Sequence, residues 1–172
     1  MIIPPVSHQE HRAAAPASVA CAVITVSDTR TEDTDTSGRA IADLLVRGGH
    51  RVAGRALVRD EPTQVEAAIG RFTADPDVQV IILTGGTGIS QRDGTYETVS
   101  RLMEKRLDGF GELFRMLSYQ EIGPAAMLSR ACAGSMRGRI VVALPGSENA
   151  VRLAMTKLLL PELGHLVREV GR

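Results

Sequence analysis

Short apolar runs alternate along the chain with segments whose apolar residues recur at helical spacing. Four of these runs are predicted as strands, because most of them are hydrophobic on both faces, as in a buried parallel sheet. They cover residues 19–27, 51–58, 78–84 and 139–144. The run VQVIILT at 78–84 is continuous in Val, Ile and Leu, so we expect it to lie in the centre of the sheet.

Helices are predicted between and after these strands from the spacing of the apolar residues. In the first, Ala40, Ile41, Leu44 and Leu45 share one face, and the pattern ends at a glycine pair. The predicted helices cover residues 40–47, 63–72, 95–105, 109–121, 124–130, 148–160 and 161–170. Strands that alternate with helices predict an α/β fold, a three-layer αβα sandwich around a mostly parallel sheet.

The length of 172 residues is that of one domain, which we place at residues 19–172 after a flexible N-terminal tail at 1–18. The tail lacks the continuous apolar stretch of a secretory signal, and no segment approaches the roughly 20 apolar residues of a membrane span. Cys21 and Cys132 form no C-x-x-C pair, so we expect small apolar fillers rather than a disulfide or a zinc site. A cytoplasmic location is the simplest expectation.

The charged residues exclude several classes of binding site. The 20 basic and 20 acidic residues give zero formal net charge, which is against a nucleic-acid-binding surface. Only Lys105 and Lys157 among the basic residues are lysines, and neither follows a glycine turn, so a phosphate loop of the G-x-x-x-x-G-K-[ST] type is excluded. A dinucleotide fingerprint is also excluded, because the glycines follow the third strand with the spacing G-G-T-G.

The predicted strands end in residues suited to binding a charged ligand. These ends are Ser27-Asp28, Asp60-Glu61, Gly85 to Gly88 and Pro145-Gly146-Ser147. In open α/β sheets, ligands bind outside the carboxyl ends of the strands, so we expect the four ends to form one site. The segment Thr84 to Gly88 predicts a phosphate cradle, since successive backbone N–H groups can point at one anion. The alternative is a tight strand-to-helix turn that needs glycine for its positive φ.

Two carboxylates are candidate ligands for a metal at this edge. Asp93 precedes Gly94-Thr95 and is suited either to capping the next helix or to binding a cation. Asp60 at the end of a neighbouring strand favours the second role, because two carboxylates that face a phosphate site can hold Mg²⁺. Asp28 is a third candidate, although its loop through Asp35 also fits an ordinary solvated turn. Without a lysine, Arg92 or Arg130 would supply the cationic side chain.

The segment from Gly109 to Glu121 is more apolar than one helix face requires. Its large apolar residues are Phe110, Leu113, Phe114, Met116, Leu117 and Tyr119. These side chains are either buried within the monomer or form a subunit interface, and the second interpretation is favoured slightly.

Several separated motifs resemble the MoaB/MogA family of molybdenum cofactor biosynthesis proteins, from about Val19 to the C-terminus. They are VITVSD, LTGGTG followed by RD, GFGELFRMLSYQEIG, AMLSRA and LPGS. The chain is also similar to the G domains of gephyrin and of plant molybdenum insertases, and GFGELFRMLS points to the MoaB branch.

The resemblance implies a molybdopterin-binding domain that, in active members, adenylylates molybdopterin with Mg²⁺ and ATP and releases pyrophosphate. Asp60 and Asp93 match the acidic residues that support Mg-nucleotide chemistry in the family. The resemblance further implies a set of residues that bind phosphate or pterin: Ser27, Thr84, Gly85, Gly86, Thr87, Gly88, Ser118, Ser129, Arg130, Pro145, Gly146 and Ser147. It also implies homotrimers, or hexamers built as dimers of trimers in the MoaB branch, and handover of the product to a molybdenum insertase.

Two other functions stay open at this point, because the MoaB branch includes apparently inactive members. One is a catalytically silent protein that binds and delivers molybdopterin. The other is an assembly module in which the carboxyl edge of the sheet is vestigial.

Overall fold

The computed structural model describes residues 15–172, so most of the predicted tail lies outside the described part of the chain. Its centre is a six-stranded sheet in the order β2-β1-β3-β6-β5-β4. The strands are β1 (Ala20–Val26), β2 (Arg51–Val58), β3 (Val80–Thr84), β4 (Lys105–Arg106), β5 (Cys132–Met136) and β6 (Arg139–Leu144). The four predicted strands are β1, β2, β3 and β6, and they pair with one another in parallel, which confirms a mostly parallel sheet.

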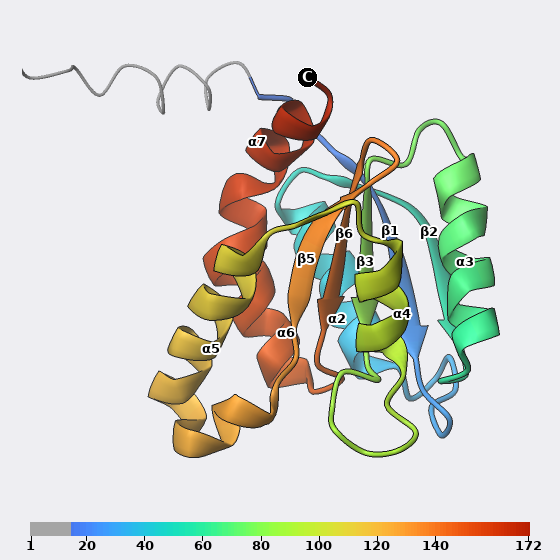
Figure 1. Cartoon of the computed structure of the whole chain (residues 1–172). Coiled ribbons are helices and arrows are strands. Elements are labelled where there is room, and N and C mark those ends of the chain that lie inside the picture. Colours follow the sequence, from blue (N-terminus) through green and yellow to red (C-terminus); the bar gives the residue numbers. More distant parts are fainter. Residues whose placement is uncertain (1–14) are drawn as a thin grey trace, which may run out of the picture.

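Helices cover both faces of the sheet, as predicted for a three-layer sandwich (Figure 1). They are α2 (Thr36–Arg47), α3 (Pro62–Ala74), α4 (Thr95–Leu102), α5 (Asp108–Ile122), η1 (Gly123–Leu128), α6 (Glu148–Ala154), η2 (Met155–Leu159) and α7 (Leu160–Val170). One face packs against α2, α5, α6 and α7, and the other packs against α3 and α4. Residues of β1 alternate between these layers: Cys21 and Val23 face the first, Ala22 and Ile24 the second.

Two antiparallel strands were missed by the hydrophobic pattern. β5 pairs with β6 through a two-residue turn at Arg137-Gly138, where both φ angles are positive, at 48° and 73°. Such a turn suits a tight hairpin, but β5 reads CAGSM and its small residues favour strands weakly. β4 then pairs with β5, so the helix predicted at 95–105 ends earlier, at Leu102.

Smaller differences concern the second half of the chain. The short helix predicted at 124–130 is the 3₁₀ helix η1, which ends at Leu128. The last two predicted helices are joined through the π-helical turn η2, and Pro161 lies in the first turn of α7, where proline is tolerated. Both cysteines are buried, and burial raises the pKa of Cys21 to about 12, as expected for an apolar filler. Within residues 15–172, no helix has the length and apolar character to cross a membrane.

Candidate functional site

A cavity of about 720 Å³ lies at the carboxyl edge of the parallel strands. The ends of β1, β3 and β6 and the loop after β2 line its polar side, and α5 and η1 line its apolar side. All predicted site residues except Arg130 line this cavity: Ser27, Asp60, Thr84, Gly85, Gly86, Thr87, Gly88, Asp93, Ser118, Ser129, Pro145, Gly146 and Ser147. The parallel topology therefore brings together residues that are more than a hundred positions apart in the sequence.

The glycine turn after β3 is a tight strand-to-helix turn and also lines the cavity. Gly85 and Gly86 have φ of 102° and 67°, and a Cβ on Gly85 would lie 2.1 Å from the carbonyl oxygen of Val26. Glycine is therefore required by the backbone at this position. The Thr84 hydroxyl donates a hydrogen bond of 2.9 Å to the Pro145 carbonyl, which joins this turn to the loop after β6. The turn also lines the cavity, and its role as a phosphate cradle stays a prediction.

Asp60 occupies a buried position beside other carboxylates. The residue is 8% exposed, and its Oδ1 accepts the N–H of Gly94 at 3.1 Å. Burial raises the pKa of Asp60 above its ordinary value, and the charges of Asp93 and Asp28 raise it further, against the lowering effects of the Gly94 N–H and Arg92. Asp60 would thus be stabilised in its ionised form by a bound cation.

Asp93 does not cap the following helix, so the capping alternative is wrong. The N-cap of α4 is Gly94, which makes no side-chain capping bond, and the acceptor for its N–H is Asp60 from another loop. The Asp93 Oδ2 instead accepts the N–H of Ser90 at 2.8 Å. Gly88 makes room for this carboxylate, since a Cβ there would lie 2.6 Å from Asp93 Oδ2. The Asp93 carboxylate is therefore held by the loop between β3 and α4, and it lines the cavity.

Asp28 also belongs to the site and is more than part of a solvated turn. Its Oδ1 accepts the backbone N–H of Asp60 at 3.2 Å, and its Oδ2 accepts two bonds from the Arg92 guanidinium at 3.0 and 3.1 Å. These bonds from Arg92 are the main cause that lowers the pKa of Asp28. Arg92 also pairs with Glu61 at 2.9 Å, so its charge is shared between two carboxylates.

Arg130 lies beside the cavity rather than in its lining. Its Nε donates to the carbonyl of Thr87 at 3.3 Å, and its Nη2 donates to the carbonyl of Gly88. Its guanidinium also pairs with Glu97 of α4 and lies 4.8 Å from the centre of the Tyr96 ring. Arg130 is therefore placed to hold the loop after β3, and its role as a ligand-binding residue stays a prediction.

Several residues that line the cavity were not predicted from the sequence. Arg30 follows β1 in the loop interpreted as a possible solvated turn, and its side chain reaches the cavity. The apolar side of the cavity is formed by Phe114, Ile122, Ala125, Ala126, Leu128 and Ala150. Arg30 carried no motif signal, although its place just after a strand end was the available clue.

The residues at this edge fit Mg²⁺ by their chemistry. No group of three or more His, Cys, Asp or Glu in residues 15–172 is arranged to hold a metal, but Mg²⁺ needs only one or two carboxylates together with water and phosphate oxygens. Oxygen atoms converge above Gly86, where a Cβ would lie 2.4 Å from Asp60 Oδ2 and 2.2 Å from Thr95 Oγ1. The Thr95 hydroxyl is buried and has no hydrogen-bond partner within the described residues. Hard oxygen ligands of this kind suit magnesium.

We expect Asp60→Asn to raise the unfolding temperature of the metal-free protein at pH 7. Asparagine keeps an acceptor for the Gly94 N–H and removes the buried charge that faces Asp93 and Asp28. Because the folded-state pKa is raised, the stability contributed by protonated Asp60 is present below its ordinary value of 3.8 and is lost as the pH rises through the raised pKa. The gain should therefore vanish near pH 3. Thermal unfolding in EDTA checks this, and a lower unfolding temperature of the variant at pH 7 would contradict it.

Comparison with known proteins identifies the family. A family model described as a probable molybdopterin binding domain matches residues 22–165. Molybdenum cofactor biosynthesis protein B of Bacillus cereus is 49% identical over 164 residues, which cover 95% of this chain and 97% of that protein. The chain belongs to the MoaB/MogA family.

Solved structures of MoaB/MogA proteins share the fold. A crystal structure of molybdenum cofactor biosynthesis protein B has a TM-score of 0.87 and 50% identity, and the match covers 91% of this chain and 98% of that one. The tungsten cofactor synthesizing protein MoaB from Pyrococcus furiosus has a TM-score of 0.80 and 36% identity, and the match covers 92% of this chain and all of that one. The resemblance seen in the motifs and the predicted fold class are both confirmed.

Proposed function

We propose that this MoaB/MogA family member adenylylates molybdopterin with Mg-ATP and releases pyrophosphate. The observation that carries the proposal is one cavity lined by Asp60, Asp93 and the glycine turn after β3. Its 720 Å³ lies in the range of small-molecule sites, and its apolar side offers a surface for a flat ring.

In the proposed reaction, an oxygen of the terminal phosphate of molybdopterin attacks the α-phosphorus of ATP. A new P–O–P linkage forms, the bond between the α-phosphorus and the bridging oxygen breaks, and pyrophosphate leaves with that oxygen. No side-chain nucleophile is needed, so the contribution of the protein is placement and charge stabilisation. The backbone of residues 85–88 would orient phosphate oxygens, and the apolar wall would exclude water from the reacting groups. Mg²⁺ held by Asp60 and Asp93 would neutralise charge on the nucleotide.

The test is pyrophosphate release by the purified protein. We expect release only when molybdopterin, ATP and Mg²⁺ are all present, and none after addition of EDTA. A protein that binds molybdopterin tightly but releases no pyrophosphate would instead be a molybdopterin-binding or delivery protein. Failure to bind either molybdopterin or ATP would leave only the assembly role.

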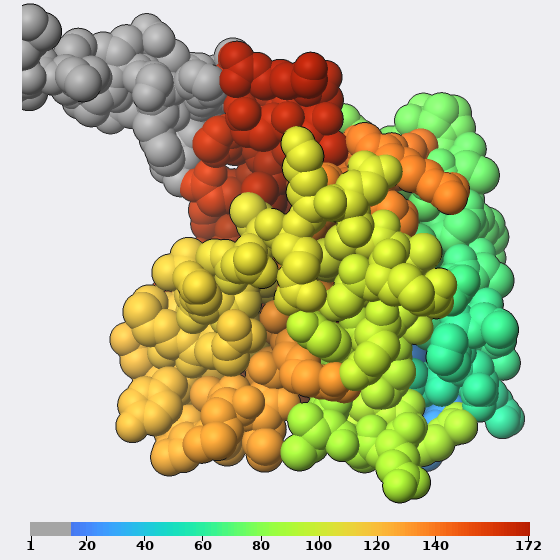
Figure 2. All heavy atoms as spheres, in the orientation of Figure 1, coloured from blue at the N-terminus to red at the C-terminus, as the bar shows by residue number. Residues whose placement is uncertain are grey.

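We also propose that the chain assembles into trimers, or hexamers of two trimers, and passes its product to a molybdenum insertase. Phe110 and Phe114 of α5 are buried, so the monomer accounts for part of this apolar helix. Leu113, Met116 and Tyr119 are 48%, 52% and 61% exposed, and α5, the helix that carries them, lies at the left of Figure 2 in yellow. Exposed apolar side chains in a contiguous group support a subunit contact.

Replacing Met116 by glutamate is therefore expected to shift the protein toward smaller species, because a charge would be desolvated in the contact. Val46→Glu is the matched control, since Val46 is 62% exposed and belongs to α2 rather than to α5. Sedimentation velocity measures the result. An unchanged assembly for Met116→Glu, or an equal shift for both variants, would contradict this placement of the interface.

A further inference from the structure

Two arginines, Arg30 and Arg92, line the cavity, and they differ in how closely carboxylates neutralise their charges. The Arg92 guanidinium is paired with Asp28 and with Glu61 at close range. Arg30 has a carboxylate partner only at 4.0 Å, where its Nη1 faces Asp35 Oδ1, beyond hydrogen-bonding distance. Among the described lining residues, Arg30 is therefore the cation whose charge is least neutralised at close range.

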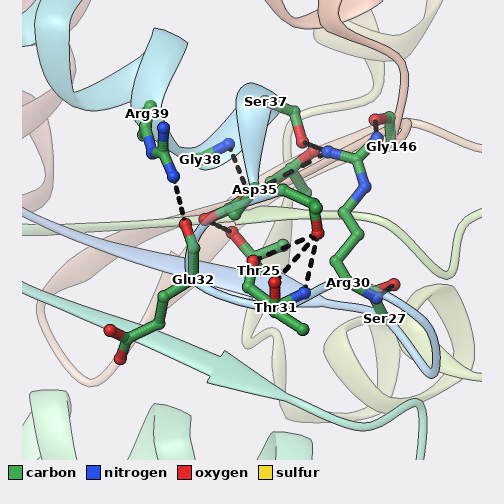
Figure 3. Close-up of polar contacts among 12 residues, drawn as sticks. Thr25, Ser27, Arg30, Thr31, Glu32, Asp35, Ser37, Gly38, Arg39 and Gly146 are labelled. Carbon is green, nitrogen blue, oxygen red and sulfur yellow. Dashed lines mark hydrogen bonds and ion pairs between the residues drawn. The ribbon is translucent and has the colours of Figure 1, made fainter.

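The side chain of Arg30 is held in one orientation by its neighbours (Figure 3). Its Nη1 donates to the Ser37 hydroxyl at 2.7 Å, and its Nη2 donates to the Gly146 carbonyl at 3.0 Å. Its backbone N–H donates to Ser27 Oγ at 3.1 Å, which fixes the start of the loop. The guanidinium therefore joins the loop after β1, which carries Arg30, to the first turn of α2 and to the loop after β6.

Asp35 fixes the position of this arrangement from the interior. Asp35 is 3% exposed, and its carboxylate accepts bonds from the Gly38 N–H at 2.9 Å and the Thr25 hydroxyl at 2.9 Å. On the side away from the cavity it pairs with Arg55 at 2.7 Å. The Asp35 carboxylate is thus held by bonds from Gly38, Thr25 and Arg55, and its closest cation is Arg55 rather than Arg30.

Arginine has five N–H donors in a planar fork, and within the described residues the Arg30 guanidinium directs two of them to protein acceptors. The remaining donors belong to a side chain that lines the cavity and is 28% exposed. A planar fork with free donors matches the oxygens of a phosphate better than those of a neutral group.

We propose that Arg30 binds a phosphate group of the substrate and so determines specificity for a phosphorylated ligand in this cavity. The proposal rests on the proposed function for the identity of that ligand. The same chemistry is offered by the phosphate monoester of molybdopterin and by the polyphosphate of ATP, and the binding of each is measured separately.

The experiment compares Arg30→Gln with Arg30→Lys and with the matched control Arg55→Gln. Arg55 contacts the same carboxylate but does not line the cavity, so its loss reports any indirect effect through Asp35. Calorimetric titrations with molybdopterin, and separately with Mg-ATP, are run on variants whose thermal unfolding matches the wild type within a few degrees.

We expect Arg30→Gln to weaken one of the two ligands about 10- to 100-fold, since a hydrogen bond to a charged group is lost. Arg30→Lys should recover part of this affinity through its charge, and Arg55→Gln should bind like the wild type. The proposal is overturned if Arg30→Gln binds both ligands within twofold of the wild type, or if Arg55→Gln loses as much affinity. Binding without turnover in the wild type would reject the proposed reaction but leave the role of Arg30 standing.

Discussion

Asp93→Asn is expected to lower the rate of adenylyl transfer by about 100-fold or more while leaving the unfolding temperature near that of the wild type. The change preserves the size of the side chain and the oxygen that accepts the Ser90 N–H. It removes one of the two carboxylates proposed to hold Mg²⁺, and loss of charge stabilisation in a transition state costs about 100- to 1,000-fold for a single group. The readout is product formation under saturating ATP and molybdopterin.

Asp33→Asn is the matched control for this variant. Asp33 is an exposed acidic residue that does not line the cavity, so its neutralisation changes the net charge by the same amount. We expect its rate to equal that of the wild type. If Asp93→Asn keeps more than about a tenth of the wild-type rate, the assignment of Asp93 as a metal-binding residue is wrong.

Arg130→Ala is expected to reduce turnover by about 10- to 100-fold with a much smaller change in the affinity for molybdopterin. The Arg130 guanidinium donates to the carbonyls of Thr87 and Gly88, and at 3.5 Å to that of Asp93, so one side chain holds both ends of the loop. Without it, the loop samples other positions and the carboxylate of Asp93 is no longer fixed. Arg130→Lys keeps the charge but lacks the fork, so we expect a similar loss.

The control for Arg130 is Arg106→Ala. Arg106 contacts the same Tyr96, with its guanidinium 5.6 Å from the ring centre and its Nη2 bonded to the hydroxyl at 3.0 Å, but it makes no bond to the loop after β3. Steady-state rates and molybdopterin titrations of the two variants separate loop positioning from general packing around Tyr96. Equal loss of turnover in both would show that Arg130 acts only through that packing.

Much of the fold could be predicted from sequence because the central strands are strongly apolar. β3 and β6 are buried on both faces, and most of their residues are Val, Ile and Leu. β5 could not be found in this way, because Ala, Gly and Ser carry little strand preference and its pairing depends on β6. The two residues of β4 form a strand only because β5 lies beside them.

The site was predictable where it follows from topology and less so where it depends on side-chain direction. Ser27, Asp60 and Gly146 were expected at one edge because parallel strands end together, and they line one cavity. Sequence could not show that Arg130 turns toward loop carbonyls while Arg30 turns into the cavity. Likewise, the acceptor for the N–H of Gly94, the N-cap residue of α4, proved to be Asp60, a residue 34 positions away.

The most direct test of the account is transfer of label from ATP to molybdopterin. Purified protein is incubated with Mg²⁺, molybdopterin and ATP labelled at the α-phosphate. The pterin product is then isolated, and its mass is measured by mass spectrometry. We predict one labelled AMP group per pterin, joined through the terminal phosphate, with one pyrophosphate released for each transfer. Molybdopterin that is bound by the protein but recovered unlabelled, with ATP intact, would contradict the proposed reaction.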